Sequence, residues 1–259
     1  MLDRPRVSVV IPAINEERNL PYVLSRIAPD VFEVVLVDGE STDKTCEVAR
    51  SLWPGVRIVK QEGRGKGAAL RAGFAATTGE IIVMLDGDGS TDPAELPAFV
   101  GALLAGADVA KGSRFIQGAG TADMPLYRRM GNRAFVAMVR ILFGGRYSDL
   151  CYGYNAFWRS ALARLDLDGD GFEIETMLNI RALRAGLRVV EVGSFEDKRH
   201  YGESNLRTVP DGWRVLKTIL RERRAAPSRA RGRRTLQDAA PVTVAGGDAV
   251  QLISGRDPA

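Results

Sequence analysis

Two aspartates separated by one glycine, Asp86-Gly87-Asp88, are the residues of this sequence best placed to do chemistry. They directly follow the apolar run 81–85, which is typical of a buried strand. Two carboxylates at this spacing can converge on one hard cation, and Gly87 lets the backbone approach closely. Mg²⁺ or Mn²⁺ prefers such ligands and would neutralise charge that develops on a diphosphate leaving group. A polar turn in which the aspartates serve as caps is the alternative.

A calcium-binding loop does not fit these aspartates. Counted from Asp86, the sixth position, where such a loop needs glycine, is Thr91, and the twelfth, where it needs glutamate, is Pro97. The acidic segment 166–171 begins like a calcium loop, but its twelfth position is Met177. We therefore expect an acidic turn before a helix there.

Three further polar clusters follow apolar runs in the same way, at residues 12–17, 38–43 and 63–67. The last of these, Gly63-Arg64-Gly65-Lys66-Gly67, lacks the spacing of a phosphate-binding P-loop, because Gly67 stands where that loop has its metal-binding hydroxyl. Lys66 at the start of a helix can still pair with an anion, although a solvated basic turn is an equally simple interpretation.

Alternating strands and helices are expected to position these clusters. Apolar runs predict strands at 7–11, 32–37, 56–60, 81–85 and 108–111, and apolar residues at helical spacing predict helices at 16–27, 43–52, 66–76 and 94–105. The strands are continuous β-branched runs, as in a parallel sheet that helices cover on both faces. In such a sheet a ligand binds at the carboxyl ends of the strands, so the four clusters are expected to lie together.

Length and composition indicate one α/β domain. The chain has 259 residues, 45% of them hydrophobic and 26% charged. Seven arginines and one acidic residue lie between Arg221 and Arg234, and the segment after them has little periodicity. We therefore predict a single domain over residues 1–224 and a flexible tail over 225–259, basic at first and then of low complexity.

Several classes of site and location are disfavoured by composition. The longest stretch without a charged residue, 96–107, is shorter than the roughly 20 apolar residues of a membrane span. No apolar signal segment opens the chain, which predicts a cytoplasmic location. Two cysteines build no disulfide framework, and a single histidine, His200, excludes most zinc sites. The net charge of +4 is modest, and we expect no nucleic-acid partner.

The polar clusters, taken in order, resemble those of family 2 glycosyltransferases with the GT-A fold, which is an α/β, Rossmann-like fold with a mostly parallel sheet. The second half of the chain is similar to the dolichyl- and polyprenyl-phosphate hexose (mannose or glucose) synthases of that family. The resemblance covers about residues 5–222. The matching segments are Pro12…Asn15-Glu16, Asp38…Ser41-Thr42-Asp43, Arg64-Gly65-Lys66-Gly67, Asp86-Gly87-Asp88, Gly112-Ser113-Arg114-Phe115, Arg128-Arg129-Met130-Gly131-Asn132, Ser148-Asp149 and Arg199-His200-Tyr201-Gly202-Glu203-Ser204.

The resemblance implies roles for individual residues. Asp88 is expected to ligate Mg²⁺ or Mn²⁺ directly, while Asp86 reaches a metal-bound water and the ribose. The nucleotide-sugar donor is expected to contact Pro12, Ile14, Glu16, Asp38, Lys66, Asp86, Gly87, Asp88, Arg114 and Arg199. The acceptor is expected to contact Arg128, Asn132, Asp149 and Ser204, and the catalytic residues are expected to be Asp88, Asp149, Arg128 and Arg199.

Three departures bear on the acceptor and the donor. Gly39 and Glu40 stand where the family has a second aspartate, and Asn155 and Asn205 stand where lipid-phosphate enzymes commonly have Arg and Lys. Fewer cations weaken the match to a lipid-phosphate acceptor. If the acceptor is a hydroxyl, Asp149 would serve as its general base, whereas a phosphate acceptor needs none.

Two basic amphipathic segments, 124–143 and 210–224, predict a peripheral contact with an anionic membrane. The alternative is that both helices pack on the sheet and expose their arginines to water.

Taken together, the sequence predicts an inverting, metal-dependent hexosyltransferase that uses a UDP- or GDP-hexose, and the inversion follows from the resemblance alone. The preferred acceptor is a polyprenyl phosphate at the cytosolic membrane face. One alternative is transfer to a hydroxyl of a soluble small molecule, such as a natural product or a glycan. An alternative of another class is a sugar-1-phosphate nucleotidyltransferase, although residues 12–16 replace the Gly-rich loop which that reaction needs after the first strand.

Overall fold

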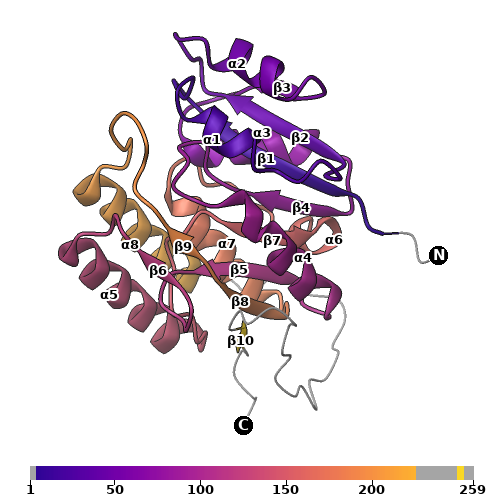
Figure 1. Ribbon diagram of the computed structural model, residues 1–259. Helices are drawn as coiled ribbons and strands as arrows, with labels where there is room; N and C mark the ends of the chain where they lie inside the picture. The colour runs from indigo at the N-terminus through magenta and orange to yellow at the C-terminus, as the bar shows by residue number, and fades with distance from the viewer. Residues whose placement is uncertain (1–3, 226–249, 254–259) are drawn as a thin grey trace.

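The computed structural model describes residues 4–225 and 250–253. Over these residues the chain forms a mostly parallel sheet with helices on both faces (Figure 1), which confirms the predicted α/β class. The strands are β1 (Val7–Ala13), β2 (Glu33–Asp38), β3 (Arg57–Lys60), β4 (Ile81–Met84), β5 (Val109–Ser113), β6 (Gly120–Thr121), β7 (Asn155–Trp158), β8 (Val189–Gly193), β9 (Phe195–Glu196) and β10 (Val250–Ile253). The helices are α1 (Leu20–Leu24), α2 (Thr45–Leu52), α3 (Lys66–Ala76), η1 (Pro93–Glu95), α4 (Leu96–Leu104), α5 (Leu126–Phe143), α6 (Arg159–Leu162), α7 (Glu173–Arg184) and α8 (Thr208–Arg224).

The main sheet has the strand order β10-β8-β5-β7-β4-β1-β2-β3 among the described residues. β4, β1, β2 and β3 pair in parallel, as the apolar runs predict. β7 lies between β4 and β5 and runs antiparallel to both, and β10 runs antiparallel to β8. The short strands β6 and β9 form a separate parallel pair.

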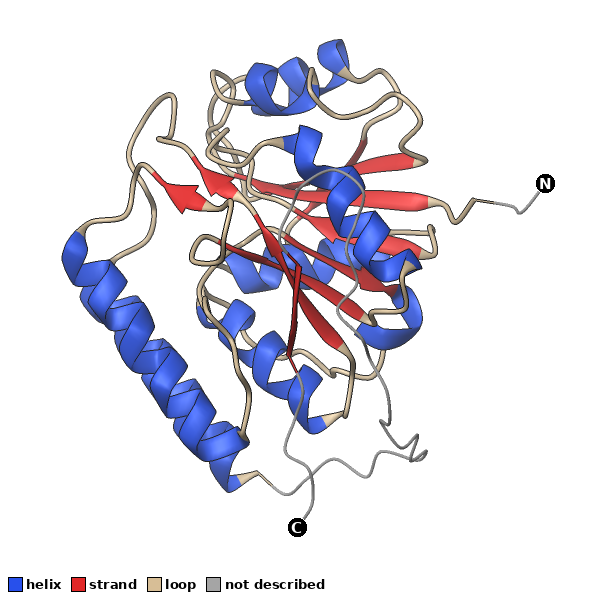
Figure 2. Cartoon of the chain, turned by 60° about the horizontal axis from the view of Figure 1, so that its bottom comes forward, coloured by secondary structure: helices blue, strands red, loops and turns tan. Residues whose placement is uncertain are grey.

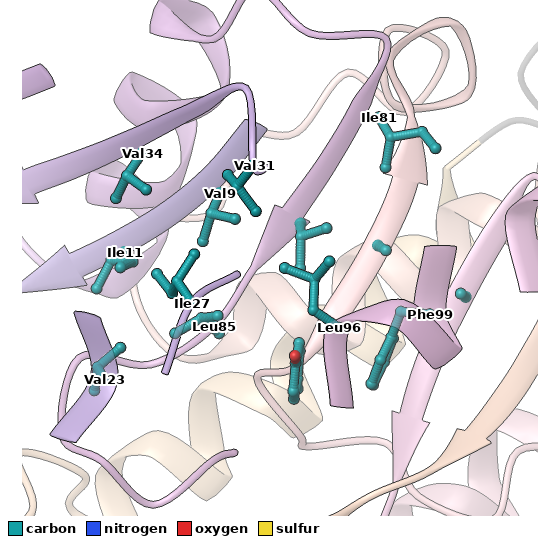
Figure 3. Packing of buried hydrophobic residues seen from close by; sticks show 14 of the residues in the cluster. Val9, Ile11, Val23, Ile27, Val31, Val34, Ile81, Leu85, Leu96 and Phe99 are labelled. Carbon is teal, nitrogen blue, oxygen red and sulfur yellow. The ribbon is translucent and has the colours of Figure 1, made fainter. Parts of the chain in front are cut away.

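Successive residues of the central strands point to opposite faces of the sheet and so supply two cores. Val9 and Ile11 of β1 belong to the core under α1 and α4, where Leu96 and Phe99 pack (Figure 3). Val10 between them belongs to the core on the other face, under α3 and α7. Burial on both faces explains why these strands read as continuous apolar runs.

Three of the predicted helices are shorter than expected, among them the one predicted at 94–105, which runs from Leu96 to Leu104 as α4. The prediction of a helix over 16–27 is wrong at both ends, because α1 begins at Leu20, after a turn in which the amide of Asn19 donates to the carbonyl of Glu16, and ends at Leu24. The helix predicted at 43–52 begins at Thr45, whose amide donates to the Asp43 carboxylate. The helix predicted at 66–76 has those bounds.

The two long helices α5 and α8 lie next to each other (Figure 1) at one flank of the sheet (Figure 2), where α8 packs on α7 and α5 packs on α8. Of the predicted tail, 225–259, only Ala225 and strand β10 belong to the described residues, and the prediction for 226–249 and 254–259 lies outside them. None of the helices that the structure describes combines the length and the apolar character that crossing a bilayer requires.

Candidate active site at the carboxyl edge of the sheet

The loops that follow β1 and β2 are tied together at the carboxyl edge of the sheet. Asn15 accepts the amide of Thr42 at 2.8 Å through its side chain, and its own amide donates to Ser41 Oγ at 3.0 Å. Asn15 has a positive φ of 56°, a conformation that asparagine tolerates better than most residues. These bonds hold together the two loops, which form a rim at the edge of the sheet. On this rim Ile14 is 43% exposed and Asp38 is half-buried.

Asp86 and Asp88 lie on the turn directly after β4, beside this rim. A Cβ on Gly87 would stand 3.2 Å from the Pro12 carbonyl, so glycine allows the turn to lie close against β1. Asp88 Oδ1 accepts hydrogen bonds from the amide and the hydroxyl of Ser90, at 3.0 and 2.7 Å. The side chains of both aspartates are about a quarter exposed, so they are open to solvent.

Lys66, the first residue of α3, reaches into this cluster from the other face of the sheet. Its ammonium lies 2.6 Å from Asp86 Oδ1 and 2.7 Å from Glu175 Oε1. Burial alone lowers the pKa of Lys66, but the two carboxylates outweigh it, so the pKa is raised and the side chain stays charged. The amide of Ala68 donates to the Asp170 carbonyl, so the acidic turn 166–170 covers the start of α3.

Arg199 approaches Asp88 from the segment after β9. Its guanidinium donates to Glu16 Oε1 at 2.5 Å and lies 3.4 Å from Asp88 Oδ2. Glu16 is 5% exposed, and burial raises its pKa even though Asn19 and Arg199 donate hydrogen bonds that lower it. The structure therefore pairs Glu16 with Arg199, and the expected contact of Glu16 with the nucleotide-sugar donor stays a prediction.

Arg114, directly after β5, and Asp149, in the segment before β7, form a buried ion pair. Arg114 Nε lies 2.7 Å from Asp149 Oδ2, and Nη1 lies 2.9 Å from Glu196 Oε1. Asp149 is fully buried, and the side chain of Arg114 is 5% exposed. In this structure the two side chains are therefore paired with each other, and the expected contacts of Arg114 with the donor and of Asp149 with the acceptor stay predictions.

The remaining residues that the sequence predicts on the acceptor side lie on or near the long helices. Arg128, on the first turn of α5, donates to Thr208 Oγ1 at 3.2 Å and so joins α5 to α8. Asn132 is buried and accepts the amide of Leu150 at 3.1 Å, while its Nδ2 has no hydrogen-bond partner among the described residues. Ser204 is exposed in the segment before α8, and its hydroxyl accepts the amide of Leu206.

The family model of glycosyl transferase family 2 matches residues 8–166, more than half of the chain. The chain belongs to this family. The suspected relationship is thereby confirmed, and the predicted GT-A fold agrees with the solved structures that the chain resembles.

Two curated relatives and one solved structure illustrate the similarity. The chain is 34% identical over 215 residues to a polyprenol monophosphomannose synthase of Mycolicibacterium smegmatis, covering 78% of this chain and 81% of that one. It is 30% identical over 211 residues to a dolichol-phosphate mannosyltransferase of Pyrococcus furiosus, covering 78% of this chain but 59% of that one. The glucosyl-3-phosphoglycerate synthase of Mycobacterium tuberculosis, crystallised with Mn²⁺, UDP and phosphoglyceric acid, is 27% identical, with a TM-score of 0.69 and coverage of 86% and 80%.

In this glycosyltransferase chain the two aspartates fit a divalent cation by the chemistry of their donor atoms. Among residues 4–225, Asp88 Oδ2 has only the long contact with Arg199, and Asp86 pairs with the monovalent ammonium of Lys66, with which a divalent ion can compete. Within the described ranges, no group of three or more His, Cys, Asp or Glu side chains is arranged to hold a metal on its own. Two protein carboxylates suit Mg²⁺ or Mn²⁺, which take their remaining ligands from water and phosphate oxygens.

Two residues beside Asp86 and Lys66 are not predicted from the sequence. Glu175 lies 109 positions from Lys66 along the chain, and only the fold brings them together. Gly153 leaves room for both side chains, since a Cβ there would stand 2.5 Å from Asp86 Oδ2 and 2.7 Å from Lys66 Nζ. A signal was present for Glu175, because it interrupts the apolar segment of α7 with a charge that is costly to bury unpaired.

Proposed function

We propose that the protein transfers a hexose from a UDP- or GDP-sugar, with inversion and with Mg²⁺ or Mn²⁺ as cofactor. The observation that supports this most strongly is the pair Asp86 and Asp88 at the carboxyl edge, with one cation, Lys66 or Arg199, on each. The two carboxylates can bind the metal ion, and the two flanking cations can bind the oxygens of the diphosphate.

Asp88 and Asp86 would hold the divalent ion, which supplies the charge that stabilises the leaving diphosphate. Lys66 and Arg199 bind diphosphate oxygens from either side, because an ammonium and a guanidinium are suited to polyanions. At the rim, Pro12, Ile14 and Asp38 bind the nucleoside. Asp149 acts through Arg114, and we place both as positioning residues that hold the acceptor side of the site.

The preferred acceptor is a polyprenyl phosphate at the cytosolic membrane face, bound by Arg128, Asn132 and Ser204. The names of the relatives support this choice, since two of them act on polyprenol or dolichol phosphate. The surface of α5 and α8 supports it independently. Its exposed large apolar side chains are Leu126, Tyr127, Met130, Ile141, Val209, Trp213 and Leu220.

Basic residues accompany these apolar side chains on the same helices, including Arg129, Arg133, Arg214 and Lys217. Lys217 Nζ lies 5.6 Å from the centre of the Trp213 ring, so an apolar and a cationic group are adjacent on α8. A surface of this composition binds anionic membranes peripherally. We define these exposed apolar residues and their basic neighbours as the α5–α8 surface.

A second candidate is transfer to a soluble phosphorylated or hydroxylated small molecule. The similarity to the glucosyl-3-phosphoglycerate synthase, which was crystallised with phosphoglyceric acid, favours it. Asn155 favours it too, because this residue is buried beside the site and brings no cation for a lipid phosphate. The family match offers no support for a sugar-1-phosphate nucleotidyltransferase.

A partition assay tests the donor and the acceptor together. Radiolabelled UDP- or GDP-hexose is incubated with Mn²⁺ and either a polyprenyl phosphate or phosphoglycerate, and the label is followed into organic solvent or water. We expect label in the organic phase that requires the polyprenyl phosphate, and none with Asp88→Ala. Label transferred only to the soluble acceptor would favour the second candidate, and transfer by Asp88→Ala equal to wild type would remove the metal role.

A further inference from the structure

Lys66 bridges a solvent-accessible carboxylate and a buried one. The side chain of Asp86 is 28% exposed, whereas that of Glu175 is 6% exposed, and both lie within 2.7 Å of the same ammonium. A divalent cation that arrives from solvent therefore meets Asp86 and not Glu175. Because the ammonium and the arriving ion are both positive and need the same oxygen, Lys66 must leave Asp86 for the ion to bind it there.

Glu175 provides the place to which Lys66 can withdraw. It lies on the first turn of α7, and its neighbours on that helix, Ile174, Thr176, Met177 and Leu178, are buried. A carboxylate in such surroundings needs a charged partner, and Lys66 is the one with which it forms an ion pair. Without Glu175, the ammonium of Lys66 would be left desolvated beside a dication once it is displaced from Asp86.

The same arrangement recurs at the second aspartate. Arg199 lies between Asp88, whose side chain is 23% exposed, and Glu16, whose side chain is 6% exposed. Each aspartate of the proposed metal site thus shares its cation with a buried glutamate. This repetition on two different elements shows that the glutamates are part of the site's charge arrangement.

We propose that Glu175 is a positioning residue for metal binding, because it holds Lys66 when a divalent ion takes Asp86 and keeps that ammonium beside the diphosphate. The inference rests on the proposed function, in which Asp86 and Asp88 hold the ion. Without Glu175, Lys66 would have Asp86 as its only close carboxylate in the part of the chain that the structure describes, and would compete with the ion for it. Glu175 would therefore raise metal affinity without ligating the metal.

Equilibrium binding of Mn²⁺ tests this directly, with free Mn²⁺ measured by electron paramagnetic resonance, without donor and again with UDP. We expect Glu175→Gln to weaken Mn²⁺ binding about tenfold, as is typical of coupled charged neighbours. The matched control is Glu173→Gln, which makes the same charge change two residues earlier on α7. Glu173 accepts the amide of Gly171 and forms no ion pair with Lys66, so we expect wild-type binding.

The double variant Lys66→Met, Glu175→Gln tests whether Lys66 is the group that competes with the metal ion for Asp86. It also removes both charges of the pair, so its folding does not depend on one unpaired buried charge. We expect it to bind Mn²⁺ as tightly as wild type but to bind UDP with Mn²⁺ more weakly, because the ammonium is gone. The inference is overturned if Glu175→Gln binds like wild type, if Glu173→Gln is equally weakened, or if the double variant stays as weak as Glu175→Gln. Wild-type protein that binds no Mn²⁺ even with UDP would instead overturn the proposed metal site.

Discussion

Arg114 and Asp149 face each other as a buried, two-pronged ion pair. Arg114 Nε lies 2.7 Å from Oδ2 of the aspartate, and Nη2 lies 3.0 Å from Oδ1. The same guanidinium also donates to Glu196 and to the carbonyl of Cys151. One arginine therefore joins β5, β9 and the segment before β7.

Removing the charge of Asp149 tests the structural role of the pair. We expect Asp149→Asn to lower the free energy of unfolding by about 3–5 kcal/mol, because it leaves a buried guanidinium without its main counter-ion. Urea denaturation followed by circular dichroism measures this. The control is Asp123→Asn at an exposed position, where a change within about 0.5 kcal/mol is expected. Equal stability of the two variants would contradict the role of the pair.

The pH dependence of stability should carry the signature of the same carboxylate. Burial alone raises the pKa of Asp149, but Arg114 and Lys111 outweigh it and hold the pKa below its usual range. In the unfolded chain the pKa of Asp149 is about 3.9, so the unfolded state binds the proton more readily than the folded state. The stabilisation is therefore complete above about pH 5 and is lost as the pH falls through the pKa of Asp149 in the folded state. The difference in unfolding free energy between wild type and Asp149→Asn should shrink below about pH 4. A difference that grows toward acid would contradict this.

Gly153 should matter for donor binding more than for folding. A Cβ at this position would push Asp86 and Lys66 aside, and both are side-chain ends that can move. We expect Gly153→Ala to weaken binding of UDP with Mn²⁺ about 10- to 100-fold, as small displacements of site groups do, and to leave the unfolding temperature nearly unchanged. Calorimetric titration measures the first quantity. Gly55→Ala, where a Cβ meets only the Trp53 ring at 4.0 Å, is the control and should bind UDP like wild type.

Much of the fold follows from local pattern, and what does not follow depends on distant parts of the chain. The parallel strands can be predicted because both of their faces are buried, which requires continuous apolar runs in the sequence. Helix α3 is predicted from apolar residues at helical spacing. Strand β7 is not, because its four residues gain strand structure only by pairing with β4 and β5 on either side. The edge cluster around Asp86 and Asp88 is likewise predictable from topology.

The partners of the site's charged residues are not predictable in this way. An isolated arginine or glutamate in a sequence gives no sign of which opposite charge it will meet after folding. The sequence therefore does not show that Arg114 pairs with Asp149 and Glu196, as it does in the fold. The partner of Glu16 is equally unpredictable, since Arg199 lies 183 residues further along the chain.

The α5–α8 surface should retain the protein on vesicles that contain anionic lipid at low salt. Each lysine or arginine near such a surface contributes about 1 kcal/mol, so Lys217→Ala should weaken binding about fivefold. Trp213→Ala should weaken it as well, since the ring is 57% exposed. Leu104→Ala, at a similarly exposed apolar residue on α4, is the control and should bind like wild type. Sedimentation with vesicles measures all three, and retention only on neutral vesicles, or none at all, would contradict the membrane contact.

Thermal unfolding with UDP, with and without Mn²⁺, tests the central claim most directly, that Asp86 and Asp88 hold a cation which binds the donor diphosphate. A ligand at about 100 times its Kd stabilises the folded state by about 2.7 kcal/mol, enough for a clear shift in Tm. The shift should require UDP or GDP together with Mn²⁺ in wild type and should vanish in Asp88→Ala. A shift of the same size in Asp88→Ala, or in wild type without any divalent ion, would contradict the claim.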